Sequence, residues 1–237
     1  MNKASGRYLI NCLDLTKPKN GDIIRLTKID RKEDKMKERL KNAKKPQGEY
    51  GASVLDGMNE RHNDGEVWGI SKLRLSSARE ILDIGCGGGR NIANFLELIP
   101  DAYVTGIDYS EVSVEKSIEY NKTAIEKGAA EVLQGDVSRL PFKSPRFDII
   151  TAFETIYFWP EIEKCFRDIF GALNDGGQFL VCNEVSSREQ FEEWGKLVGM
   201  NFYSQEDIEK LMQISGFKST KSFRHEDGRW MCVIGYK

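Results

Sequence analysis

The sequence predicts an α/β fold built on a mostly parallel sheet, and three observations support this fold class. From residue 79 onward, short apolar stretches typical of buried strands alternate with amphipathic stretches typical of helices. Such alternation indicates βαβ units, whose strands run parallel because a helix returns the chain to the same end of the sheet. The last 21 residues hold two more strand-like stretches around a short turn, which predicts an antiparallel hairpin at the sheet edge.

The expected elements follow in chain order. Parallel strands are expected at residues 79–84, 102–107, 131–134, 147–153 and 178–184. Helices are expected around Ile92–Ile99, from a Ser110 cap to about Lys127, over 161–173, and from a Ser204–Asp207 capping box to Gly216. Gly176 and Gly177 are expected to turn the chain into the fifth strand. The hairpin strands are expected at 217–223 and 229–236, with His225 exposed beside the Asp227-Gly228 turn.

Residues 1–49 differ from the rest and are expected to form an N-terminal extension. A strand-like hairpin is predicted over 7–29 and a charged helix over 30–45. Residues 17–45 carry 12 Lys or Arg against five acids. Such a run either forms a solvated helix face or contacts phosphates, and the solvated face is favoured because no aromatic side chains interleave to stack bases.

Composition narrows the classes of protein further. The 237 residues suffice for one domain with an extension, and a net charge of -2 gives no global attraction to nucleic acid or an anionic membrane. The five cysteines are odd in number, dispersed and free of CxxC pairs, which favours reduced thiols in a cytoplasmic protein over disulfides or a zinc site. No apolar run approaches the ~20 residues that span a bilayer, and no ligand cluster predicts a metal.

The most informative stretch is a glycine-rich loop after the first strand, Asp83-Ile84-Gly85-Cys86-Gly87-Gly88-Gly89-Arg90. Glycines allow the backbone to turn sharply and to approach a ligand closely. A dinucleotide fingerprint G-x-G-x-x-G that starts at Gly85 requires glycine at position 90, and this chain has Arg90 there. The loop therefore argues against a nicotinamide or flavin dinucleotide cofactor.

The pattern Asp83-x-Gly85-x-Gly87-x-Gly89 resembles the first motif of class I methyltransferases that depend on S-adenosylmethionine (SAM). The resemblance extends over residues 50–237 and is most specific over 79–184. It implies a Rossmann-like seven-stranded sheet with helices on both faces, SAM as cofactor and S-adenosylhomocysteine (SAH) as product. It also implies that residues 50–78 form a helical lid over SAM.

The resemblance places cofactor contacts at the ends of successive strands. Asp108 ends the second strand, where a carboxylate can bind both ribose hydroxyls. Asp136 follows the third strand and corresponds to the residue that contacts the adenine amino group, with the Val137 N–H beside the ring. As alternatives, Asp83 fixes the loop, Asp108 caps a helix and Asp136 is a turn residue. The predicted cofactor-binding set is Asp83, Gly85, Cys86, Gly87, Asp108, Tyr109, Asp136, Val137 and Phe153.

The segment after the fourth strand is expected to determine the acceptor and any base. Glu154 is the candidate general base, with Glu184 at the end of the fifth strand second. The predicted substrate or lid residues are His62, Trp68, Tyr157, Trp159 and Glu184. These aromatics either wall a pocket for an apolar or cationic molecule or pack the core.

The sequence favours methyl transfer to a small-molecule acceptor. The Asn/Asp-Pro-Pro-aromatic motif common in methyltransferases of nucleic-acid bases is absent after the fourth strand. Three alternatives stay open: an RNA or protein methyltransferase that uses the basic segment, a SAM-binding module without turnover, and, least favoured because of Arg90, a nicotinamide oxidoreductase. The sequence does not predict the acceptor atom or the oligomeric state.

Overall fold

The computed structural model describes residues 42, 44–142, 144–184 and 199–237. The hairpin predicted over 7–29 lies outside these residues, as does most of the basic helix predicted over 30–45. Asn42 and Lys44, near the end of that predicted helix, are helical.

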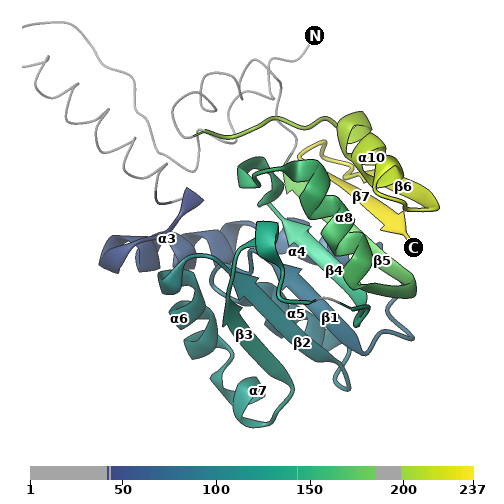
Figure 1. Ribbon diagram of the computed structural model, residues 1–237. Coiled ribbons are helices and arrows are strands. Elements are labelled where there is room, and N and C mark those ends of the chain that lie inside the picture. The colour runs from purple at the N-terminus through teal and green to yellow at the C-terminus, as the bar shows by residue number, and fades with distance from the viewer. Residues whose placement is uncertain (1–41, 43, 143, 185–198) are drawn as a thin grey trace, which may run out of the picture.

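The described residues form a seven-stranded sheet with strand order β3-β2-β1-β4-β5-β7-β6. The strands are β1 (Glu80–Ile84), β2 (Tyr103–Asp108), β3 (Ala130–Gln134), β4 (Phe147–Phe153), β5 (Leu173–Glu184), β6 (Ser219–Arg224) and β7 (Trp230–Tyr236). The first five strands pair in parallel, whereas β7 is antiparallel to both β5 and β6. The predicted α/β fold with a C-terminal antiparallel hairpin is confirmed (Figure 1).

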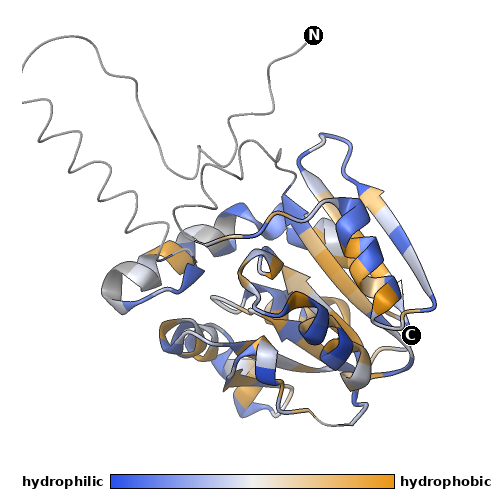
Figure 2. Cartoon of the chain, turned by 45° about the horizontal axis from the view of Figure 1, so that its top comes forward, coloured by the Kyte–Doolittle hydropathy of each residue, from blue (hydrophilic) through white to orange (hydrophobic). Residues whose placement is uncertain are grey.

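Alternating apolar side chains place a hydrophobic cluster on each face of the sheet. Leu82 and Ile150 belong to one cluster, which includes residues of α8 (Ile162–Ala172) and α10 (Gln205–Ile214). Ile81 and Ile149, their direct chain neighbours, belong to the other, which includes residues of α4 (Asn63–Ile70) and α5 (Arg90–Leu98). This alternation follows from the two-residue period of a strand, so both faces need a covering layer of helices. Figure 2 shows the apolar strands between helices that carry polar outer faces.

The prediction of a single helix from Ser110 to about Lys127 is wrong at Asn121, where the helix is interrupted. Ser110 caps the helix as expected, but the chain forms α6 (Glu111–Tyr120) and α7 (Lys122–Glu126) around Asn121. The Asn121 Nδ2 donates to the carbonyl oxygens of Gly89, at 2.9 Å, and Ser117, at 3.0 Å. The interruption therefore ties this helix pair to the glycine-rich loop.

The turn predicted at Gly176 and Gly177 is instead an irregularity inside β5. Gly176 has φ +78°, which favours glycine, and the pairing of β5 with β4 shifts register between Phe147 and Ile149. The strand thus begins five residues before its expected start because the irregular residues remain within the ladder.

The C-terminal region follows the prediction except at His225. The Ser204–Asp207 capping box is present, and its two hydrogen bonds open α10. His225 was expected to be exposed, but its ring packs 5.2 Å from that of Trp68 and its Nδ1 lies 2.8 Å from an Asp227 oxygen. The correction arises because α4 lies against β7 at this edge of the sheet.

Within the described residues, α3 (Gly48–Arg61) and α4 precede the sheet, and α4 lies against it. α3 contacts α6, and α4 contacts α5, β5 and β7. The close fit of α4 depends on Gly65, since a Cβ there would lie 2.0 Å from the Trp230 ring. Among the described residues, no helix has the length and apolar character needed to cross a membrane.

We expect Gly65→Ala to lower the free energy of unfolding by about 1–3 kcal/mol, because the added methyl group pushes α4 away from Trp230. Chemical unfolding in urea measures this change. Gly171→Ala is the matched control, because Gly171 is also helical and a Cβ there meets nothing within 4 Å. The control should gain up to about 1 kcal/mol from the better helix propensity of alanine. Equal effects of both substitutions would contradict the tight packing of α4.

Candidate cofactor site

The site lies at the carboxyl ends of the central strands, where β1 and β4 lead to opposite sides of the sheet. This topological switch point is where ligands bind in open α/β sheets. A cavity of about 190 Å³ opens there, between the sheet and helices α3 and α4. The predicted site residues that line it are His62, Gly85, Cys86, Gly87, Asp108, Tyr109, Asp136, Val137, Phe153, Glu154 and Trp159.

The glycine-rich loop forms the floor of the cavity. Gly85 and Gly87 have φ of +77° and +50°, in the left-handed region that favours glycine. A Cβ on Gly85 would lie 2.3 Å from the Thr155 Cγ2, so the loop after β1 passes directly against the segment after β4. Both positions favour glycine because of their backbone conformation, and Gly85 also because of the close approach to Thr155.

Asp108 organises the end of β2. Its Oδ2 accepts a hydrogen bond from the Gly87 N–H at 3.0 Å, and its Oδ1 accepts one from the Ser110 N–H at 2.8 Å. Burial raises the pKa of this carboxyl group. A carboxylate has about four acceptor sites, so the same group can fix the loop and could exchange a protein partner for a ligand hydroxyl.

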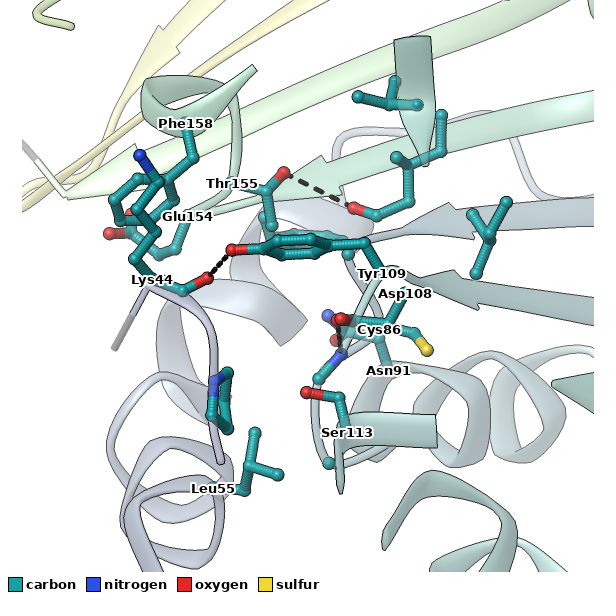
Figure 3. A pocket seen from close by; sticks show the side chains of 18 of the residues that line it. Lys44, Leu55, Cys86, Asn91, Asp108, Tyr109, Ser113, Glu154, Thr155 and Phe158 are labelled. Atoms are coloured by element: carbon teal, nitrogen blue, oxygen red, sulfur yellow. Dashed lines mark hydrogen bonds between the residues drawn. The ribbon is translucent and has the colours of Figure 1, made fainter. Parts of the chain in front are cut away.

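Tyr109 and Ser110 connect the cavity to the residues before α3. The Tyr109 hydroxyl donates to the Lys44 carbonyl oxygen, and the Ser110 Oγ donates to the Pro46 carbonyl oxygen at 2.7 Å. Figure 3 shows Tyr109 reaching across the cavity toward Lys44. The chain before α3 therefore forms one wall of the site.

Asp136 and Val137 lie at the end of β3. The Asp136 Oδ1 accepts hydrogen bonds from the backbone N–H and the hydroxyl of Ser138, both at 2.8 Å, and so caps the short helix η1 (Val137–Arg139). Both Asp136 and Val137 line the cavity. The structural role of a turn residue and the predicted role beside adenine are thus compatible.

Asp83 does not line the cavity but lies buried at the end of β1. Its Oδ1 accepts a hydrogen bond from the Thr151 Oγ1 at 2.7 Å, and its Oδ2 has no partner among the described residues. Burial, with a contribution from the charge of Asp108, raises the pKa of Asp83 to about 7. This placement fits the alternative in which Asp83 supports the loop from below.

Glu154 lies directly after β4 in a strained backbone conformation, with φ +55°. Its carboxylate accepts hydrogen bonds from the Glu184 N–H and, at 3.3 Å, from the Tyr157 hydroxyl. Burial and the charge of Glu184 raise the pKa of Glu154 to about 8. Strain of this kind persists where the surrounding structure fixes a functional group. Tyr157 and Glu184 do not line the cavity and act on it through Glu154.

The aromatic residues and histidine divide into two groups. Trp159 and His62 line the cavity, and burial, followed by the charge of Arg61, lowers the pKa of His62 to about 4. His62 is therefore neutral at pH 7. Trp68 lies outside the cavity, where its ring contacts His225 and the Lys72 ammonium group.

Several residues that line the cavity were not predicted. The most informative of them is Glu66, a buried residue of α4. Burial and the charge of Asp83 raise its pKa to about 8, which marks it as a perturbed group in the cavity wall. Glu66 is four residues from His62, a spacing that places both side chains on one face of a helix. Because His62 is a predicted site residue, this spacing could have identified Glu66 as a second one. Asn59 and Asn91 also line the cavity, and no sequence pattern marks either of them. No group of three or more potential metal ligands lies together in the described part of the chain.

The fold and the site define a class of protein, an α/β enzyme with a nucleotide-type cofactor at the carboxyl ends of its strands. The model of the methyltransferase domain family matches residues 75–221. The chain therefore belongs to the class I SAM-dependent methyltransferases, whose cofactor is SAM.

Known relatives agree with this family. Over 114 residues the chain is 32% identical to a sterol methyltransferase-like protein of Botryococcus braunii, a match that covers 48% of this chain and 29% of the relative. The chain spans about a third of the length of the curated relatives it matches.

Solved structures share the fold. The methyltransferase crystallised with the Trm112 activator of Haloferax volcanii has a TM-score of 0.68 at 17% identity, over 78% of this chain and 93% of that chain. A Haemonchus contortus phosphoethanolamine N-methyltransferase, solved with SAH, has a TM-score of 0.64 at 15% identity, over 73% of this chain and 53% of that chain.

We expect Asp108→Asn to weaken SAM binding by about 10- to 100-fold, because the carboxylate is replaced by an amide with a single acceptor oxygen. Isothermal calorimetry measures the affinity. Asp101→Asn is the control, since Asp101 is exposed in the turn before β2. Unchanged SAM affinity in Asp108→Asn would contradict the predicted contact with the ribose.

Proposed function

We propose that the chain transfers the methyl group of SAM to a small-molecule acceptor that binds beside Glu154. One observation carries the proposal. Glu154, Phe158 and Trp159, which follow β4, line the same cavity as the glycine-rich loop and Asp108. An acceptor against this wall would lie next to the cofactor.

The residues present fit SAM. Asp108 and Asp136 offer carboxylate oxygens at the ends of β2 and β3, and the glycines leave room for a ligand on the loop. SAM supplies an electrophilic methyl group on a positively charged sulfonium. The protein's part is to hold the acceptor in line with this methyl group, to exclude water and, where the acceptor carries a proton, to remove it.

Glu154 is suited to receive that proton. Glu154 lines the cavity, and burial, followed by the charge of Glu184, raises its pKa to about 8. The Tyr157 hydroxyl and the Glu184 N–H hold the carboxylate in place. Phe158 and Trp159 offer apolar surface for an apolar or cationic acceptor. The names of the sterol methyltransferase relatives agree with a small acceptor of this kind.

We further propose that residues 50–78 act as a lid, as the family resemblance implies. The Asn59 Nδ2 donates to the Gly88 carbonyl oxygen at 3.3 Å, and the Arg90 Nε donates to the Asn63 Oδ1 at 3.0 Å. Both bonds join the lid helices to the cofactor loop. Release of these contacts would open the cavity for exchange of SAM and SAH, and hydrogen exchange of α3 with and without SAH tests this.

Transfer to RNA or protein is the main alternative. It rests on the basic segment 17–45, almost all of which lies outside the described residues. The deciding experiment incubates the purified chain and methyl-labelled SAM with a dialysable cell extract, and separately with the RNA and protein fractions. SAH and label in a dialysable product support the proposal. Label in RNA or protein alone supports the alternative, and SAH binding without SAH formation supports a module without turnover.

We expect Glu154→Gln to lower kcat by about 10²- to 10⁴-fold toward an acceptor that loses a proton, because the amide cannot act as a base. The raised pKa means that Glu154 ionises as the pH rises toward about 8, so wild-type activity should rise over that range. The variant should lose this rise. Steady-state rates between pH 6 and 9 measure both effects.

Glu163→Gln is the matched control, because Glu163 lies on the exposed face of α8 and does not line the cavity. It should keep the wild-type rate and pH profile. A Glu154→Gln enzyme with a wild-type pH profile would remove Glu154 as the base.

A further inference from the structure

Glu66 is a buried carboxyl group that methyl transfer at Glu154 does not use. It lies on α4, is 8% exposed and lines the cavity. Its Oε2 is buried and has no hydrogen-bond partner among the described residues. Burial of an unpaired polar oxygen is unfavourable, so its place on a cavity wall points to a ligand that supplies the missing donor.

The charges around Glu66 specify the sign of that ligand. Asp83 on β1 and Glu154 after β4 act on it, and each adds negative charge when ionised, whereas burial raises the pKa of the Cys182 thiol on β5 and keeps that thiol neutral. Arg90, at the start of α5, is the cation whose charge acts on Glu66. His62 on the same helix is held neutral by burial. The balance of these groups favours a positively charged ligand.

The position of Glu66 specifies which part of SAM would reach it. The cavity extends from Asp108 and Asp136, the predicted adenosine contacts, past the glycine-rich loop to Glu66. A ligand with its adenosine at the first end directs its other end toward α4 and the start of α5. In SAM and SAH that other end is an amino acid, with one ammonium and one carboxylate group.

Arg90 provides the opposite charge for this amino acid. It also lines the cavity, and its Nε donates to the Asn63 Oδ1 at 3.0 Å. Its Nη1 donates to the Tyr120 hydroxyl, so the Nη2 nitrogen is the part of the guanidinium group that would reach a ligand without breaking either bond. As the first residue of α5, it adds to the positive end of that helix dipole. A charge-assisted hydrogen bond from arginine to a carboxylate is stronger than one between neutral groups.

We propose that Glu66 and Arg90 bind the amino-acid end of SAM, with Glu66 accepting hydrogen bonds from the ammonium group and Arg90 pairing with the carboxylate. The inference rests on SAM as the cofactor and goes beyond the loop and ribose contacts that the family resemblance implies. It also accounts for arginine at position 90, where a dinucleotide loop requires glycine.

The test compares SAH with 5′-methylthioadenosine (MTA), which has the same adenosine and sulfur but lacks the amino acid. Calorimetry with the full chain should show that Glu66→Gln weakens SAH binding by about 10- to 100-fold and changes MTA binding less than about twofold. Glutamine keeps the shape of the buried side chain, so the fold is retained. Arg90→Gln should likewise weaken SAH and spare MTA.

Asp64→Asn is the matched control. Asp64 lies on the same helix, is exposed and does not line the cavity, so the substitution removes a carboxylate without touching the site. SAH and MTA affinities should both match the wild type. Equal SAH affinity in Glu66→Gln and the wild type, or equal losses for SAH and MTA, would overturn the proposal.

Proton release gives a second readout. With its pKa near 8, Glu66 is mostly protonated at pH 7 before binding and must ionise to pair with an ammonium group. SAH binding at pH 7 should therefore release a proton that MTA binding does not, and Glu66→Gln should lose this release. Calorimetry in buffers of different ionisation enthalpy measures it. A wild type that binds MTA and not SAH would refute this inference, whereas one that binds neither would also refute SAM as the cofactor.

Discussion

The close approach of Gly85 to Thr155 is the constraint on which the rest of the site depends. A side chain at position 85 would overlap Thr155, so the loop after β1 can lie against the segment after β4 only because position 85 is glycine. This contact brings the cofactor loop and Glu154 to one cavity, although 69 residues separate Gly85 from Glu154 in the chain. Parallel pairing of β1 with β4 then fixes their relative height at the carboxyl edge of the sheet.

A second property of the site follows from its depth. Glu66, Asp83 and Glu154 are all buried, and burial is the largest cause of the raised pKa of each. In water such carboxyl groups would repel one another only weakly, but in this setting they favour their neutral forms until a cation arrives. SAM carries a sulfonium and an ammonium group, and these carboxyl groups hold protons that a positively charged ligand can replace. Burial therefore accounts both for the preference of the site for a positively charged ligand and for the raised pKa of the candidate base Glu154.

The sequence predicted most of the fold because its information is local. Strand alternation, the Ser110 cap and the Ser204–Asp207 box depend on neighbouring residues, and the structure confirms all of them. The misses required tertiary contacts. Asn121 interrupts a helix because it bonds to Gly89, 32 residues earlier in the chain, and the sequence contains no local sign of that partner. His225 is partly buried because its ring packs against Trp68, 157 positions earlier in the chain.

The site shows the same division at the level of single residues. Glycines and acidic residues at strand ends were predicted, since a strand end fixes where its next side chain lies. Glu66 was missed because its role depends on how α4 lies over β5 and β7, which Gly65 permits through its contact with Trp230. A glutamate in a helix is usually exposed to solvent, so its burial could be predicted only from the packing of α4 against the sheet. The helices before the glycine-rich loop therefore line the same cavity as the loop, and in our proposal Glu66 on α4 contacts the part of SAM beyond its nucleoside.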